Sequence, residues 1–255
     1  MISYLTDCCV VLFLYANLWY FISVYKKRND IADIAWGIAY IVVCLFIFFK
    51  YETGFYFKLL FLLISLWGVR LSLHIFIRNK DKKEDFRYNA WRQDWGKWFY
   101  IRSYFQVYIL QASIALVIML PILYSVDVKA EFSITSCFGI LIWISGFSIQ
   151  SLADYQLLKF VKTEKKKKGE FLQSGLWKYS RHPNYFGEIV MWWAICLILL
   201  PVSTHWIIFI SPITITLLLI FVSGIPMLEK RYQGNEKFQE YKKRTSVLIP
   251  LPQKN

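Results

Sequence analysis

Charged residues are scarce in this chain, and the acidic ones are scarcer than the basic ones. Asp, Glu, Lys and Arg together make up 18% of the 255 residues, against about 25% in an average soluble domain. The 17 acidic residues are outnumbered by 30 basic ones, so the net charge is +13. Apolar residues reach 57%, which excludes a disordered chain. A chain this apolar is also unlike a nucleic-acid-binding protein, so we expect no nucleic-acid partner.

Cysteine residues are few, and their spacing does not indicate disulfide cross-links. The sequence has five cysteines and no Cys-x-x-Cys pair, which excludes a disulfide scaffold and the common zinc spacings. We therefore expect no metal site and interpret the cysteines as small buried apolar residues. All of them lie inside apolar runs: Cys8, Cys9, Cys44, Cys137 and Cys196.

What the chain does have is a series of apolar blocks, most of them long enough to cross a bilayer. A spanning helix needs roughly 20 apolar residues. The pattern predicts an all-α integral membrane bundle of about seven transmembrane helices, followed by a charged cytoplasmic C-terminal helix. The lipid bilayer is thus its first expected partner. The blocks run over about residues 5–25, 31–49, 57–77, 99–124, 136–158, 186–200 and 206–224.

The basic residues predict the orientation of these spans. One alternate set of loops carries 25 of the 30 basic residues, and such loops face the cytoplasm under the positive-inside rule. The N-terminus is then outside and the C-terminus cytoplasmic. The first block lacks a basic leading region and a cleavage site, so we expect a retained span rather than a signal peptide. The run Lys165–Lys168 is interpreted as a solvated loop near anionic headgroups.

Polar side chains inside the spans gather toward the predicted cytoplasmic side, and the exofacial half looks almost purely apolar. Asp33 lies one turn into the second span, and Arg70 and His74 share one face of the third. Ionisable groups in a span indicate function by default, so we expect a polar cavity open to the cytoplasm. The alternative is that they only pair with each other, for example Asp33 with Arg70, to hold helices together.

The densest polar stretch, Ser174–Glu188, enters the sixth block. Pro183 and Gly187 are expected to interrupt regular helix there, and irregular backbone at membrane depth is tolerated where it lines a wet cavity. The planar guanidinium group of Arg181 is suited to binding a phosphate or carboxylate group. The basic tail that follows the seventh block is interpreted either as a membrane-surface segment or as a cap that folds back over the Arg181 loop.

The sequence resembles the steroid 5-alpha-reductase-like membrane family, and most closely its bacterial-type branch. The resemblance covers most of the chain and is most specific in its C-terminal half. It is carried by Arg-His-Pro-Asn-Tyr-Phe-Gly-Glu at 181–188, Asp-x-x-Trp-Gly at 33–37, Trp-x-x-Arg-Leu at 67–71, Glu-Asp-x-Arg-Tyr at 84–88 and Thr-Ser-x-x-Ile-Pro at 245–250.

This resemblance implies a single membrane domain over residues 1–255, with substrate-side helices in 1–125 and a cofactor-binding half in 136–255. It implies an NADPH-dependent reductase of a lipid-like enone or alkene, so a hydrophobic small molecule is the expected substrate. The residues at cofactor-contacting positions are Gln150, Asp154, Arg181, His182, Asn184, Tyr185, Glu188, Arg231 and Tyr232.

One departure concerns the proton donor. The tyrosine that protonates the substrate ketone in steroid reductases is replaced here by Ile75. Reduction of a 4-ene-3-ketosteroid by that route is therefore not expected. Asp33, His74 and Tyr88 are the candidate donors in its place.

Two other functions stay open. The Arg-His-Pro-x-Tyr loop also resembles the isoprenylcysteine carboxyl methyltransferases, which use S-adenosylmethionine. Those enzymes show a Glu-Glu pair where this chain has Glu229 followed by Lys230. A channel or transporter is the third possibility, and it requires a polar path through the exofacial half.

Overall fold

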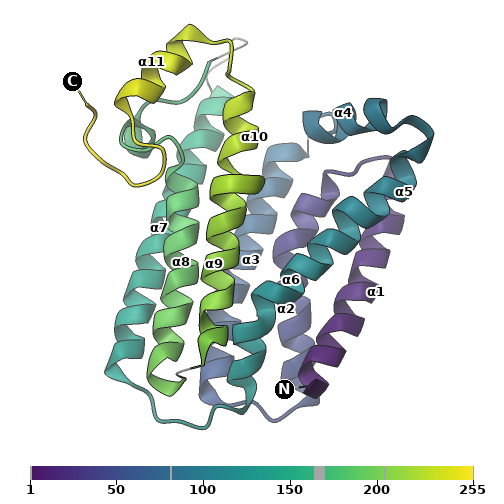
Figure 1. Ribbon diagram of the computed structural model, residues 1–255, viewed down its shortest axis with the longest axis vertical. Helices are drawn as coiled ribbons and strands as arrows, with labels where there is room; N and C mark the ends of the chain where they lie inside the picture. The colour runs from purple at the N-terminus through teal and green to yellow at the C-terminus, as the bar shows by residue number, and fades with distance from the viewer. Residues whose placement is uncertain (1, 81, 164–169, 204, 255) are drawn as a thin grey trace. The chain divides into compact units, whose positions relative to one another are not determined.

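The computed structural model describes residues 2–80, 82–163, 170–203 and 205–254. Every regular element in these ranges is helical (Figure 1). Seven helical stretches are long and apolar enough to cross a membrane, which confirms the predicted all-α multi-pass class. The chain divides into two compact units, Met1–Glu131 and Phe132–Asn255. The basic run Lys165–Lys168 lies outside the described residues.

The first unit holds four of the candidate spans. The bounds of its α-helices are α1 Ile2–Lys26, α2 Ile31–Lys50, α3 Phe55–Asn79, α4 Phe86–Trp95, α5 Phe99–Ser103 and α6 Leu110–Tyr124. A π-helical stretch, Tyr104–Ile109, joins α5 to α6. Such stretches widen a helix locally and are frequent at functional sites.

Glycines explain two local features of this unit, the end of α4 and the close contact between α2 and α3. Gly96 adopts φ +49°, a conformation that glycine takes at little cost, and α4 ends just before it. Gly37 and Gly68 let α2 and α3 touch backbone to backbone, since a Cβ on Gly37 would lie 2.5 Å from the Gly68 carbonyl oxygen.

The second unit holds the other three candidate spans. The bounds of its α-helices are α7 Ile134–Thr163, α8 Pro183–Leu199, α9 Ile210–Leu217, α10 Ile225–Lys230 and α11 Glu236–Arg244. Short 3₁₀ turns flank α8 and precede α9, and a π-helical stretch, Leu218–Val222, follows α9.

The start of α8 corrects one expectation. Pro183 and Gly187 do not interrupt the helix; Pro183 is its first residue and Gly187 lies within it. Proline is well accommodated at a first helical position because its missing N–H has no partner there anyway. Gly187 instead allows a close crossing of α7, where an added Cβ would lie 2.5 Å from the Gly146 carbonyl oxygen. The helix is therefore longer than its apolar block.

The C-terminal tail folds back onto the loop before α8, as one of the two sequence interpretations predicted. Arg181 N donates to Ser246 O at 2.8 Å, and Leu251 N donates to Tyr179 O at 3.0 Å. The Tyr241 hydroxyl donates to Trp177 O, and Ser180 Oγ donates to Leu248 O at 2.7 Å. Figure 1 shows the yellow α11 and tail beside this loop.

Candidate functional site

The close crossing of α7 and α8 positions a polar ladder between them, which we define as Gln150, Asp154, Asn184 and Glu188. Gln150 Nε2 donates to Glu188 Oε2 at 2.9 Å, and Asn184 Nδ2 donates to Asp154 Oδ1 at 3.1 Å. Each helix contributes residues four apart, which share one face. The structure thus brings four predicted cofactor residues together in two rungs.

The polar ladder is buried and has unused hydrogen-bonding capacity. Gln150, Asp154 and Glu188 expose 2%, 5% and 8% of their surfaces. Within the described residues, Gln150 Oε1 and Asn184 Oδ1 are buried with no hydrogen-bond partner. A buried polar atom left unpaired costs about 1–3 kcal/mol. Both atoms accept hydrogen bonds only, so a ligand at the ladder would have to supply donors.

Next to the polar ladder, the Glu229 carboxylate holds three basic side chains. Arg181 Nε donates to its Oε1 at 2.8 Å, and His182 Nε2 lies 3.3 Å from the same oxygen. Lys242 Nζ lies 2.9 Å from Oε2. Arg181 Nη1 also donates to the carbonyls of Lys242 and Thr245. These bonds of Arg181 therefore fasten the tail to the loop.

His182 contacts Glu229 and lies two residues before Asn184 of the polar ladder. It is buried, at 5% exposure. Burial lowers the pKa of its imidazole, and the neighbouring Glu229 carboxylate partly counteracts this shift. Its ring stacks on Tyr185 with centroids 5.5 Å apart. Its Nδ1 is buried with no partner among the described residues, so this ring also has capacity for a ligand.

The two remaining predicted cofactor residues lie at the start of the tail. Arg231 is exposed. Tyr232 stacks on Phe238 at 4.8 Å and meets Phe171 edge-on at 5.8 Å. The ring of Tyr232 is thus part of an aromatic cluster that packs α11 against the segment before α8.

In the first unit, Asp33 and Tyr88 come together as candidate proton donors. The Tyr88 hydroxyl donates to Asp33 Oδ1 at 2.9 Å, and Arg87 Nη2 donates to Asp33 Oδ2 at 2.6 Å. Asp33 therefore pairs with Arg87 and Tyr88, rather than with Arg70 as the pairing alternative supposed. Arg87 also binds Asp85; burial opposes the ionised form of that carboxyl, but the Arg87 bonds outweigh it and lower its pKa.

Two further arginine–carboxylate pairs lie at the same end of the first unit. Arg28 binds Asp30 through two nitrogens, at 3.0 and 2.7 Å. Arg92 binds Glu84 at 3.1 Å and lies 4.0 Å over the Phe99 ring. Arginine and carboxylate forks of this kind fix geometry as well as charge. His74, the third candidate donor, lies half-buried on α3.

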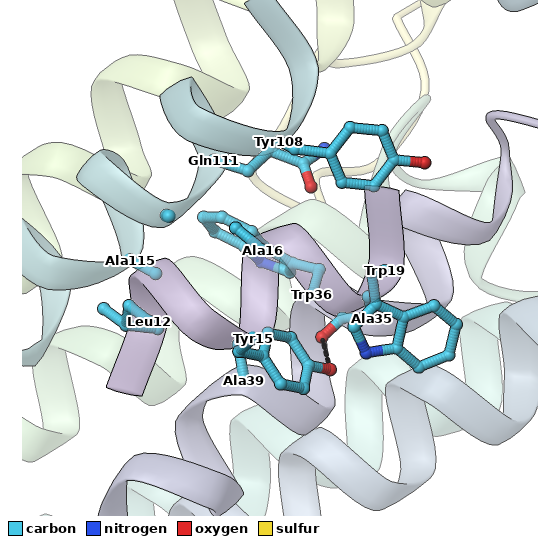
Figure 2. Close-up of a pocket in the computed structure, with 11 residues that line it drawn as sticks. Leu12, Tyr15, Ala16, Trp19, Ala35, Trp36, Ala39, Tyr108, Gln111 and Ala115 are labelled. Carbon is cyan, nitrogen blue, oxygen red and sulfur yellow. Dashed lines mark hydrogen bonds between the residues drawn. The ribbon is translucent and has the colours of Figure 1, made fainter. Parts of the chain in front are cut away.

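An apolar pocket lies among α1, α2 and α6 of the first unit (Figure 2). Five alanines and four aromatic residues form most of its wall. Together with Leu12 and Gln111, the lining consists of Ala16, Ala35, Ala39, Ala112, Ala115, Tyr15, Trp19, Trp36 and Tyr108. Trp36 belongs to the Asp-x-x-Trp-Gly motif, so it lies one turn from Asp33.

A polar cluster that the sequence did not lead us to expect lies at the opposite end of this unit. The Tyr4 hydroxyl donates to Asp127 at 2.6 Å, and the Tyr51 hydroxyl donates to Asp7 at 2.5 Å. Lys50 pairs with Asp7 at 2.7 Å. The expectation of an almost purely apolar exofacial half was therefore wrong for this end. Asp7, an acid in the first apolar block, was the signal available in the sequence.

The fold and these polar clusters define a multi-pass helical membrane protein with buried hydrogen-bonding groups in each unit. Residues 19–245 match the family described as "Protein of unknown function (DUF1295)", and the chain belongs to that family. No curated protein and no solved structure matches the chain. Among the described residues, no group of His, Cys, Asp and Glu side chains could hold a metal ion.

Proposed function

We propose that this protein is an integral membrane reductase that transfers hydride from NADPH to a lipid-like enone or alkene. The observation that carries the proposal is the polar ladder with its two unpaired amide oxygens. Ribose hydroxyls and a carboxamide are hydrogen-bond donors, so they complement Gln150 Oε1 and Asn184 Oδ1. The resemblance of residues 181–188 to the steroid 5-alpha-reductase-like family supports the same assignment.

In this proposal the ladder holds the donor-rich part of the cofactor, and Arg231, which is exposed, binds its phosphates. Arg181 acts indirectly, because its bonds to Glu229 and to the tail carbonyls fix the loop that carries His182 and Asn184. Bound NADPH would supply the hydride. The distribution of basic loops supports a cytoplasmic position for this end of the second unit.

The proton is assigned to Tyr88. Its hydroxyl donates to one oxygen of the Asp33 carboxylate, and Arg87 donates to the other. The Arg87 guanidinium also lies 5.5 Å from the Tyr88 ring centroid. Its charge would stabilise the phenolate that forms when Tyr88 gives up its proton.

One observation favours a second candidate, an S-adenosylmethionine-dependent methyltransferase of a lipid. The ladder combines two carboxylates, Asp154 and Glu188, with two acceptor oxygens. Such a set attracts a cationic ligand, and S-adenosylmethionine carries a sulfonium and an ammonium group.

Thermal unfolding of the detergent-purified protein with either cofactor tests both candidates. A single-site ligand at 100 times its Kd stabilises a protein by about 2.7 kcal/mol. We expect NADPH to raise the Tm of the wild type and not of Asn184→Ala or Glu188→Gln. The control is Ser148→Ala, an exposed position on α7, which should respond like the wild type. A shift with S-adenosylmethionine alone would establish the methyltransferase, and no shift with either would refute both.

A further inference from the structure

The end of the chain closes on itself after α11 and forms a loop over residues 244–254, which we call the tail loop. Lys254 N donates to Arg244 O at 3.0 Å, and Gln253 Nε2 donates to Thr245 Oγ1 at 2.9 Å. These two bonds join the ends of the loop, as in a compact Ω-loop. The backbone of the tail loop is therefore fixed by its own hydrogen bonds as well as by those to the loop before α8.

This fixed loop presents large aliphatic side chains to its surroundings. Val247, Ile249 and Leu251 expose 41%, 55% and 52% of their surfaces. They alternate with Leu248 and Pro250, which are partly buried. Single exposed apolar side chains are ordinary, but several of them gathered on one short loop indicate an interaction surface with an apolar partner.

The depth of the tail loop follows from what it is bonded to. Three hydrogen bonds, between 2.7 and 3.0 Å long, join it to residues 179–181. These residues lie just before Pro183, where the candidate span Pro183–Val202 begins. That span has 20 residues, which at about 1.5 Å each equal about 30 Å, the thickness of the hydrocarbon core. The tail loop therefore lies at the level of the lipid headgroups, and Figure 1 shows the yellow tail descending from α11 toward the start of α8.

Basic side chains lie at the base of the tail loop. Residues 241–254 include four basic residues and no acidic one. Lys243, Arg244 and Lys254 are exposed, and Lys242 is paired with Glu229. An apolar tip with a basic base matches a lipid surface, which offers acyl chains below anionic headgroups. A symmetric contact with a second copy would instead bring the same cations together, and they would repel each other.

We propose that the tail loop docks into the lipid leaflet at this end of the second unit. Its three exposed aliphatic side chains enter the acyl region, and its three exposed cations bind anionic headgroups. Arg181 Nη1 donates to Thr245 O in the same loop, so docking also anchors the segment that leads to the polar ladder. The inference concerns a partner of the tail and needs no cofactor, so it is independent of the proposed reductase.

A fluorophore attached at Ile249 tests the docking. The full-length protein on a cysteine-free background, with Ile249→Cys labelled by nitrobenzoxadiazole, is placed in nanodiscs of phosphatidylcholine and phosphatidylserine. We expect blue-shifted emission, quenching by a lipid with a nitroxide near its headgroup, and protection from aqueous iodide. Leu251→Cys should repeat this result. The control is Gln233→Cys, an exposed position before α11, whose label should be quenched by iodide and not by the lipid nitroxide.

Substitution of the cations tests the headgroup contact. In Lys243→Gln or Lys254→Gln the ratio of docked to undocked loop, read from the nitroxide quenching at Ile249→Cys, should fall about fivefold, the contribution of one basic residue near an anionic surface. In nanodiscs of phosphatidylcholine alone the same substitutions should have no effect. Docking that both substitutions leave unchanged would overturn the headgroup contact.

Two results would overturn the docking itself. One is iodide quenching at Ile249→Cys and Leu251→Cys as strong as at Gln233→Cys. The other is protection from iodide without quenching by the lipid nitroxide, because the cover would then be protein, either the first unit or a second copy of the chain.

Discussion

Glu229 is a single carboxylate that binds Arg181, His182 and Lys242. Its side chain is 12% exposed and that of Arg181 is 9% exposed, so their pair is largely removed from water. The Lys242 side chain is 41% exposed, and an exposed pair of this kind contributes little. The three bonds therefore differ in strength although they share an acceptor.

Replacing Glu229 by Gln should destabilise the second unit by about 3 kcal/mol, because it leaves the Arg181 charge buried without its counter-ion. The tail should exchange its amide hydrogens faster as a result, which hydrogen-exchange mass spectrometry of residues 241–254 measures. Lys242→Met serves as the control, with an expected cost below about 1 kcal/mol. Equal protection of the tail in wild type and Glu229→Gln would contradict the role given to this carboxylate.

His182 predicts a pH dependence of stability. Burial lowers the pKa of its imidazole below the ordinary 6.5; Glu229 opposes this shift and Arg181 adds to it. The unfolded chain then binds the proton more readily than the folded one, so the stabilisation is present above pH 6.5 and is lost as the pH falls. The difference in Tm between pH 7.5 and pH 5.5 should be larger in the wild type than in His182→Gln. The same difference in both proteins would show that His182 is not responsible.

At the scale of elements, the crossing of α7 and α8 decides whether the polar ladder exists. A Cβ at Gly187 would lie 2.5 Å from Gly146 O and 2.6 Å from Gln150 N. These are backbone atoms, which cannot move without shifting a helix. The rung between Gln150 and Glu188 lies next to this contact.

Gly187→Ala should therefore cost about 1–3 kcal/mol, the usual range for overpacking, and should also abolish the Tm shift caused by the cofactor. Gly234→Ala is the matched control, because a Cβ there meets nothing within 4 Å. Thermal unfolding with and without cofactor separates the two effects. If Gly187→Ala kept the wild-type shift, the close crossing would not be needed for the site.

Element boundaries show what hydropathy can and cannot predict. The second span was expected at residues 31–49 and α2 runs Ile31–Lys50, because an apolar run and a bilayer-length helix coincide there. The sixth was expected to begin at residue 186 but α8 begins at Pro183. Its first turn is polar, so no apolar pattern marks it. Only the pairing of Asn184 with Asp154 explains why polar residues belong to that helix.

For the whole molecule, the distribution of basic loops still predicts an external N-terminus and a cytoplasmic C-terminus. On a cysteine-free background, Glu52→Cys should react with a membrane-impermeant maleimide in intact cells. Gln233→Cys should react only after the membrane is permeabilised. Both positions are exposed, so access to the reagent depends on the side of the membrane. The reverse labelling pattern would overturn the predicted orientation.

The sequence by itself determined the class of protein, because the length and spacing of apolar runs are set by the bilayer and need no knowledge of packing. It also named Asp33, Tyr88, Gln150, Asp154, Asn184 and Glu188 as residues of interest. Only the tertiary structure decided their partners: Arg87 for Asp33, and the two rungs across α7 and α8. Partner choice depends on which helix faces meet and how closely. Glycines far apart in the chain set that distance, and no local pattern reports it.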